Sequence, residues 1–140
     1  MDFPEFEGLD TTKYTIQVVD DIAINTRLLE KILSKFNFNV KVYNNSNLAF
    51  DSIATDAPQV ILLDCMMPGI DGMTYLRQMR EDPRFKDIRV IMVSAVSESS
   101  EIAKAFTLGA NDYLTKPINI KKLTSVLAAQ LREYEGLKQN

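Results

Sequence analysis

Histidine is absent from this chain of 140 residues, and cysteine occurs once, as Cys65. The lack of histidine excludes the usual zinc sites, a Ser-His or Cys-His nucleophile pair, and a phosphohistidine carried by the chain itself. A single cysteine excludes an internal disulfide. Because no histidine is present to activate its thiol, Cys65 is interpreted as a small apolar residue in a loop.

Long basic runs and long apolar runs are also missing. No run of Lys and Arg exceeds two residues and the net charge is −3, so we expect no direct nucleic-acid binding by this domain. No apolar stretch approaches the roughly 18 residues of a membrane span, and the first residues show no signal-peptide pattern. We therefore expect a cytoplasmic protein without a membrane segment. Its 46% apolar and 25% charged residues are typical of one soluble domain.

What the chain does have is a regular alternation of short apolar runs and helical patterns. The strand-like runs cover residues 14–19, 39–43, 60–64, 90–94 and 112–115, and the helical patterns cover about 24–36, 46–54, 71–80, 99–108 and 120–134. Strands that alternate with helices predict βαβ units and a parallel sheet. The expected fold class is therefore α/β: a (βα)5 doubly wound, flavodoxin-like sheet of five strands in the order 2-1-3-4-5.

The two ends of the chain lack this periodicity. Residues 1–12 combine acids and turn residues with Phe3 and Phe6, and we expect a mobile N-terminal arm with the two phenylalanines as its docking residues. The folded domain itself is predicted to cover residues 13–134. The polar residues 135–140 are expected to form a frayed C-terminal tail or the start of a linker.

Local signals mark three helix ends. Ser46 is the expected N-cap of the second helix. Asp71, directly before Gly72, is interpreted as the N-cap of the third helix rather than as a metal ligand. Gly109 is expected to close the fourth helix in a left-handed conformation.

Acidic residues follow the first and the third apolar runs. Asp20 and Asp21 come directly after the first run, and Asp64 ends the third, before a Pro/Gly loop. Parallel strands end at one sheet edge, and strands 1 and 3 are neighbours in this order, so the three carboxylates are expected to converge. They would repel one another unless a cation sat between them. A cluster of oxygen ligands favours Mg²⁺, with the backbone carbonyl of Met66 as a further ligand.

The fourth and fifth runs end in a hydroxyl, Ser94, and in an ammonium, Lys116. Beside a cation, Asp64 can act as an oxygen nucleophile toward a bound phosphoryl group. Phosphoryl transfer requires positioning and neutralisation of charge, which Lys116 supplies by its positive charge and Ser94 by a hydrogen bond. The carboxylate is already ionised at neutral pH, so the lack of histidine does not impede this chemistry.

Four motifs in register carry a family resemblance: Val18-Val19-Asp20-Asp21, Leu63-Asp64-Cys65-Met66-Met67-Pro68-Gly69-Ile70-Asp71-Gly72, Val93-Ser94-Ala95 and Gly109-Ala110-Asn111-Asp112-Tyr113-Leu114-Thr115-Lys116-Pro117. With them the chain resembles the receiver domain of two-component response regulators over roughly residues 13–134.

The resemblance implies a role for each matching residue. Asp64 corresponds to the phosphoacceptor, and Asp20 and Asp21 to the acidic pair that holds Mg²⁺. Ser94 and Tyr113 correspond to the switch hydroxyl and the switch aromatic residue. The remaining match, Lys116, resembles the lysine that contacts the phosphoryl group, and the bond from it to the following proline is typically cis in this family.

The expected function is a phosphorylation-dependent signalling switch. A histidine kinase or a histidine phosphotransfer protein would donate the phosphoryl group to Asp64 in an Mg²⁺-dependent step. Ser94 and Tyr113 would then shift the surface of the fourth helix, fifth strand and fifth helix, which would control a partner, an attached output domain or a homodimer. We expect no dedicated enzyme activity beyond self-phosphorylation from a phosphodonor and self-dephosphorylation.

Three alternative functions concern the same residues. A flavin carrier would need a phosphate cradle after the first strand, where Asp20-Asp21 would repel a phosphate. An aspartyl phosphatase would usually carry a second Asp two residues after Asp64, where this chain has Met66. A docking module in which phosphorylation is incidental stays open, because the sequence separates it poorly from a switch.

Overall fold

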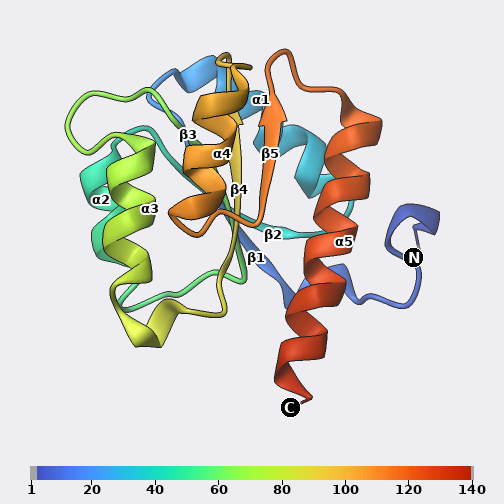
Figure 1. Cartoon of the computed structure of the whole chain (residues 1–140). Helices are drawn as coiled ribbons and strands as arrows, with labels where there is room; N and C mark the ends of the chain where they lie inside the picture. Colours follow the sequence, from blue (N-terminus) through green and yellow to red (C-terminus); the bar gives the residue numbers. More distant parts are fainter. Residues whose placement is uncertain (1–2, 140) are drawn as a thin grey trace.

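The computed structural model describes residues 3–139 of the chain. Within this range five strands and five α-helices alternate along the sequence (Figure 1). The strands are β1 (Thr15–Val19), β2 (Asn39–Tyr43), β3 (Val60–Asp64), β4 (Arg89–Ser94) and β5 (Asp112–Thr115). The α-helices are α1 (Ala23–Ser34), α2 (Ser46–Ser52), α3 (Gly72–Arg80), α4 (Ser99–Thr107) and α5 (Ile120–Lys138), and three short 3-10 helices are η1 (Pro4–Phe6), η2 (Thr11–Lys13) and η3 (Pro83–Phe85).

All neighbouring strands pair in parallel, in the order β2-β1-β3-β4-β5. This confirms the predicted doubly wound α/β fold and its strand order. The register places Val19 of β1 opposite Leu63 of β3. Because each of these residues precedes an aspartate, the register brings Asp20 and Asp64 to the same level at the carboxyl edge of the sheet.

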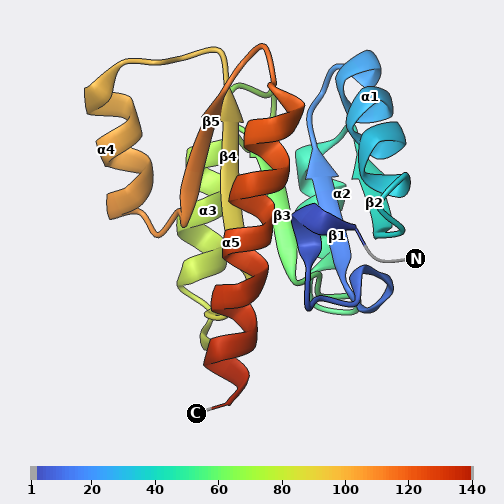
Figure 2. The ribbon, with the colours of Figure 1, turned by 90° about the vertical axis from the view of Figure 1, so that its right-hand side faces the viewer.

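The helices cover both faces of the sheet (Figures 1 and 2). Alternate residues of β3 point to opposite faces, as strand geometry requires. Ile61 and Leu63 pack in a core with α2, α3 and α4, whereas Val60 and Leu62 pack in a second core with α1 and α5. Burial of β3 on both faces explains its unbroken apolar sequence.

The helix ends show how local sequence starts and stops each helix. Asp71 caps α3, because its Oδ1 accepts a hydrogen bond from the backbone N–H of Thr74 at 2.8 Å. Gly109 follows α4 with a positive φ of 111°, as predicted. The prediction for α2 was wrong by one residue: Asn45, and not Ser46, is the N-cap, with its Oδ1 accepting from the N–H of Leu48.

The N-terminal segment packs against the domain through its phenylalanines, and its mobility stays a prediction. Phe6 is 1% exposed, and its ring packs edge-on against Phe36 and Phe38. The Phe3 ring also packs against Phe36, so both phenylalanines dock as expected. Two 3-10 helices formed by this segment thus lie against the sheet face that carries α1 and α5 (Figure 2).

Most of the C-terminal segment is helical. The helix α5 does not stop at Tyr134 but runs on to Lys138, so most of the expected tail is helical. The Tyr14 hydroxyl donates a hydrogen bond to Glu135 Oε1 at 2.6 Å, and Arg132 donates to the carbonyl of Glu7 at 3.0 Å. These contacts hold the last turns of α5 against the N-terminal segment. The last expected tail residue, Asn140, lies outside the described residues.

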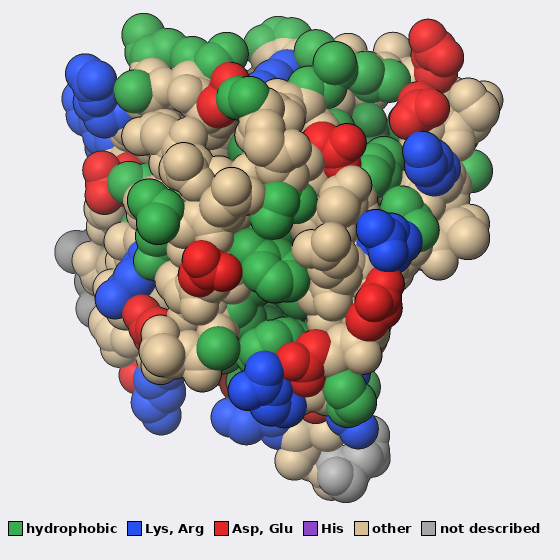
Figure 3. Space-filling view, turned by 90° about the vertical axis from the view of Figure 1, so that its left-hand side faces the viewer, with side chains coloured by type: hydrophobic (Ala, Val, Ile, Leu, Met, Phe, Trp, Pro, Cys, Tyr) green, Lys and Arg blue, Asp and Glu red, His purple; other side chains and the backbone are tan. Residues whose placement is uncertain are grey.

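Charged side chains lie on the outer faces of the helices. Acidic and basic side chains are interspersed on the face seen in Figure 3, over α2 and α3, as is typical of helices that face solvent. Among the described helices, none combines the length and apolarity needed to cross a bilayer.

Candidate functional site

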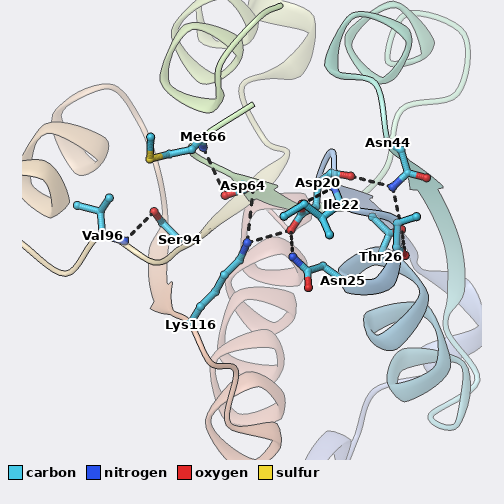
Figure 4. A network of polar contacts seen from close by, with 11 residues as sticks. Asp20, Ile22, Asn25, Thr26, Asn44, Asp64, Met66, Ser94, Val96 and Lys116 are labelled. Carbon is cyan, nitrogen blue, oxygen red and sulfur yellow. Dashed lines mark hydrogen bonds and ion pairs between the residues drawn. The ribbon is translucent and has the colours of Figure 1, made fainter. Parts of the chain in front are cut away.

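The carboxyl edge of the sheet brings the three predicted acidic residues together, and Figure 4 shows two of them, Asp20 and Asp64. Asp20 follows β1 and Asp64 ends β3, and one carboxylate oxygen from each of Asp20, Asp21 and Asp64 lies within 4.8 Å of the others. The side chains of Asp20 and Asp64 are buried, whereas Asp21 is exposed. Two of the three negative charges are therefore largely shielded from water, which makes their mutual repulsion costly.

Lys116 joins this cluster from the end of β5. Its Nζ lies 3.0 Å from Asp20 Oδ2 and 3.6 Å from Asp64 Oδ2. Burial lowers the pKa of Lys116, but its hydrogen bond to Asp20 and the charge of Asp64 outweigh burial and raise the pKa overall. The side chain of Lys116 therefore stays positively charged in the site. The peptide bond between Lys116 and Pro117 is cis.

The carboxyl group of Asp64 has an unusual environment. Burial raises its pKa, the charge of Asp20 raises it further, and the charge of Lys116 opposes both. The backbone N–H of Met66 lies 3.4 Å from Asp64 Oδ1. One ammonium faces three carboxylates here, so the site has an excess of negative charge that a divalent cation would offset.

Two asparagines that the sequence interpretation missed hold Asp20 in place. Asn25 donates to Asp20 Oδ2 at 3.1 Å, and the backbone N–H of Ile22 donates to Oδ1 at 2.9 Å. Asn44 donates both to the carbonyl of Asp20 and to Thr26 Oγ1. A signal for Asn44 existed, because it directly follows β2 and so belongs to the same sheet edge as the acids.

Ser94 and Tyr113 meet at the loop between β4 and α4. Ser94 is fully buried, and its Oγ accepts a hydrogen bond from the N–H of Val96 at 3.1 Å. The Tyr113 ring is turned inward and is 8% exposed, and its hydroxyl donates to the carbonyl of Val96 at 2.8 Å. The two predicted switch residues thus hold both backbone groups of one residue, Val96, which the sequence interpretation missed.

The two residues after Asp64 differ in exposure. Cys65 is buried, with its Sγ 4.0 Å from the Tyr113 hydroxyl. Burial raises the pKa of its thiol, which favours the neutral, apolar form. The Met66 side chain is 67% exposed. The role of the Met66 carbonyl as a metal ligand stays a prediction.

The donor set fits a hard divalent cation. All three converging ligands are carboxylates, the class that Mg²⁺ prefers, and a nearby lysine leaves the cluster with excess negative charge. A cavity of about 560 Å³ opens beside Asp20, Asp64 and Lys116, with Leu28 and Ile120 on its apolar wall. The carboxylates can therefore be reached from outside, as a site that receives a ligand must be.

Comparisons with known proteins identify the family of this chain. The sequence profile of the response regulator receiver domain matches residues 16–128. The response regulator PleD of Caulobacter vibrioides (strain NA1000 / CB15N) is 40% identical over 104 residues, which cover 74% of this chain and 23% of PleD. The transcriptional regulatory protein KdpE of Staphylococcus aureus (strain NCTC 8325 / PS 47) is 37% identical over 125 residues, which cover 89% of this chain and 51% of KdpE.

A solved structure shows the same fold. The crystal structure of a putative response regulator from Chloroflexus aurantiacus J-10-fl matches with a TM-score of 0.81 and 29% identity, over 85% of this chain and 98% of that one. The chain spans about a quarter of PleD and about half of KdpE. From its sequence and its fold, the chain belongs to the response regulator receiver domains of two-component signalling systems.

Proposed function

We propose that this chain is a phosphorylation-dependent switch in which Asp64 accepts a phosphoryl group from a phosphohistidine. The observation that carries this proposal is the position of the Lys116 ammonium between Asp64 and Asp20, beside the clustered carboxylates. Because the chain has no histidine, the donor would be another protein, a histidine kinase or a histidine phosphotransfer protein.

The residues of the chain supply the nucleophile and part of the positive charge. An ionised oxygen of Asp64 forms a bond to phosphorus while the bond between phosphorus and the imidazole nitrogen breaks. The imidazole leaves with the bonding electrons and takes up a proton from water. Lys116 offsets the charge of the phosphoryl oxygens, and no general base is needed because the attacking carboxylate has no proton to lose.

The acidic cluster supports Mg²⁺ as the cofactor. Asp20, Asp21 and Asp64 would hold the ion, with the Met66 carbonyl as the further predicted ligand. When bound, the ion supplies positive charge that offsets the phosphoryl oxygens. Asn25 keeps Asp20 oriented toward the cluster by its hydrogen bond to Oδ2.

Ser94 and Tyr113 would convert this local event into a change of surface. A phosphoryl group on Asp64 would offer the Ser94 hydroxyl a charged acceptor and so weaken its hold on the N–H of Val96. Since Tyr113 holds the carbonyl of Val96, the loop that leads into α4 would repack. This is a shift between two packings that one electrostatic event biases.

The surface formed by α4, β5 and α5 would carry the output. It would change its affinity for a separate target, for an output domain attached to the chain, or for a second copy in a homodimer. The relative KdpE is named a transcriptional regulatory protein and extends well beyond the matched region, which supports an attached output domain as one arrangement. The chemistry of the domain itself would be limited to taking up and hydrolysing its own phosphoryl group.

Intact mass spectrometry tests the proposal. With Mg²⁺ and acetyl phosphate, the wild-type chain should gain the mass of one phosphoryl group. Asp64→Asn should abolish this gain because the amide is not a nucleophile at this position. Lys116→Ala should strongly reduce it or uncouple it from the switch. Asp51→Asn, an exposed carboxylate on α2, is the control and should gain mass normally.

A wild-type chain that gains no phosphoryl mass from acetyl phosphate or from a phosphorylated histidine kinase would contradict the proposal. That result would favour the docking module instead. A gain that persists in Asp64→Asn would place the acceptor at another residue.

A further inference from the structure

The helix α4 is held mainly at its two ends. Only Ala105 of this helix is fully buried, and Ile102 packs partly buried against the same core. Phe106 is 44% exposed, and Glu98 at the N-cap makes no side-chain capping bond. In Figure 2 the helix stands at the border of the molecule, beyond β5. Few buried apolar contacts therefore fix its body, and the contacts at its ends decide where it lies.

The N-terminal end of α4 is tied to the proposed switch. Val96, three residues before the helix, is bound through its N–H by Ser94 and through its carbonyl by Tyr113. Any change at Ser94 must therefore act on this end of the helix first.

The C-terminal end of α4 is tied to Arg80, the last residue of α3. The Arg80 Nε donates to the carbonyl of Gly109 at 3.0 Å, and its Nη2 donates to Asn111 Oδ1 at 2.9 Å. Its Nη1 donates to the carbonyls of Phe85 and Lys86 at 3.0 and 3.3 Å. One guanidinium thus joins the connection between α4 and β5 to the connection between α3 and β4.

The packing around this guanidinium is close. A Cβ on Gly109 would lie 2.8 Å from the Arg80 Cγ, and Gly109 has a φ of 111°. Both the close contact and the positive φ favour glycine at this position. Asn111 Oδ1 also accepts from the N–H of Val90 at 2.8 Å, which attaches the same point to β4. The end of α4 is therefore joined to a strand that is buried on both faces.

The four acceptors of the Arg80 guanidinium are neutral: three backbone carbonyls and one amide oxygen. Burial lowers the pKa of Arg80 to about 10, with the charge of Arg89 acting in the same direction. The group stays charged at neutral pH without an acid in direct contact. Its planar fork of donors, rather than an ion pair, is what holds the two connections.

We propose that Arg80 is a positioning residue that fixes the C-terminal end of α4 as a pivot. A displacement of Val96 then tilts α4 around a fixed point, the segment 109–111, instead of shifting the whole helix. This inference rests on the proposed switch for its signal, but the anchoring itself is a property of the chain alone. Arg80 takes no part in phosphoryl transfer.

Amide hydrogen exchange followed by NMR, with and without Mg²⁺ and acetyl phosphate, tests the pivot. Arg80→Met keeps the length and apolar stem of the side chain and removes its donors. Exchange at residues 108–111 should become at least about tenfold faster, because several charged hydrogen bonds are lost. Arg77→Met is the matched control, since Arg77 lies on the same helix, is exposed and forms an ion pair with Glu81. Exchange at residues 108–111 in this variant should equal that of the wild type.

Phosphorylation supplies the second readout, which a merely structural role would not change. In the wild type, phosphorylation should alter exchange at residues 95–103 and leave 108–111 unchanged. In Arg80→Met the change should extend to 108–111, while the gain of phosphoryl mass stays within about twofold of the wild type. Asn111→Asp keeps the side-chain acceptor of Arg80 and should behave as the wild type. Asn111→Leu removes this acceptor and should resemble Arg80→Met. The two Asn111 variants keep the proposal testable if Arg80→Met does not fold.

Equal exchange at 108–111 in Arg80→Met and Arg77→Met would overturn the pivot. So would a wild-type chain in which phosphorylation alters 108–111 as strongly as 95–103. A wild-type chain that gains no phosphoryl mass would instead contradict the proposed function, and the comparison of exchange rates without acetyl phosphate would still decide whether Arg80 anchors α4.

Discussion

Gly72 shows how a single residue sets the backbone beside the acidic cluster. It begins α3, and its N–H donates to the carbonyl of Cys65 at 3.0 Å. A Cβ at this position would lie 2.8 Å from the Cys65 Cα and closer still to the Asp64 carbonyl oxygen. The loop that follows Asp64 therefore folds back against its own backbone, and only glycine leaves room for it.

We expect Gly72→Ala to destabilise the domain by about 1–3 kcal/mol, the usual cost of overpacking, because backbone atoms must move apart. Urea unfolding followed by circular dichroism measures this change. Gly136→Ala in α5 is the control, since a Cβ there meets nothing within 4 Å and alanine should stabilise the helix by up to about 1 kcal/mol. Two variants of equal stability would contradict the packing argument.

At the scale of elements, the N-terminal segment and the end of α5 support each other. Both lie outside residues 16–128, the range that the family profile covers. Tyr14 links them, because its hydroxyl donates to Glu135 and its ring packs edge-on against Tyr134. The last turns of α5 extend past the end of the family match and are held there by this segment.

The hydrogen bond of Tyr14 predicts a loss of stability at high pH. Burial and the bond to Glu135 raise the pKa of Tyr14 above its ordinary value near 10. Above about pH 10 the unfolded chain releases this proton while the folded chain keeps it, so the free energy of unfolding falls as pH rises. The urea midpoint of the wild type should therefore drop between about pH 9 and pH 11 by more than that of Tyr14→Phe. Parallel curves for the two proteins would contradict this role.

At the scale of the whole molecule, the site joins elements that are distant in the sequence. Asp20 follows β1, Asp64 ends β3 and Lys116 follows β5, while two apolar cores on opposite faces of the sheet hold these strands in place. An ion bound by the carboxylates of β1 and β3 would bind the folded chain only, because the unfolded chain separates them. Binding would therefore stabilise the entire fold by mass action.

We expect Mg²⁺ to raise the Tm of the wild-type chain by a few degrees relative to the same protein in EDTA. Asp20→Asn should lose most of this response because one ligand is removed. Asp51→Asn, which changes the net charge equally on α2, should keep it. Thermal unfolding by circular dichroism provides the measurement, and an equal response of the Asp20 and Asp51 variants would show that Mg²⁺ acts by general screening.

The sequence by itself determined the elements, the strand order and the edge at which the acids and Lys116 gather. Strand and helix periodicities are local, and the carboxyl ends of parallel strands meet by topology, so residues placed directly after strands are predictable. The family was equally accessible, since the four motifs are short and contiguous. The roles of Asp64, Ser94, Tyr113 and the Met66 carbonyl stay predictions.

The tertiary structure alone decided which groups meet once those elements pack. It decided that the Phe6 ring packs against Phe36 and Phe38. It also placed Val96 between Ser94 and Tyr113, and Gly109 against Arg80. The contacts of Phe6 with Phe36, of Tyr113 with Val96 and of Arg80 with Gly109 join segments far apart in the chain. Their geometry depends on the distances between packed helices and strands, which no local pattern of residues records.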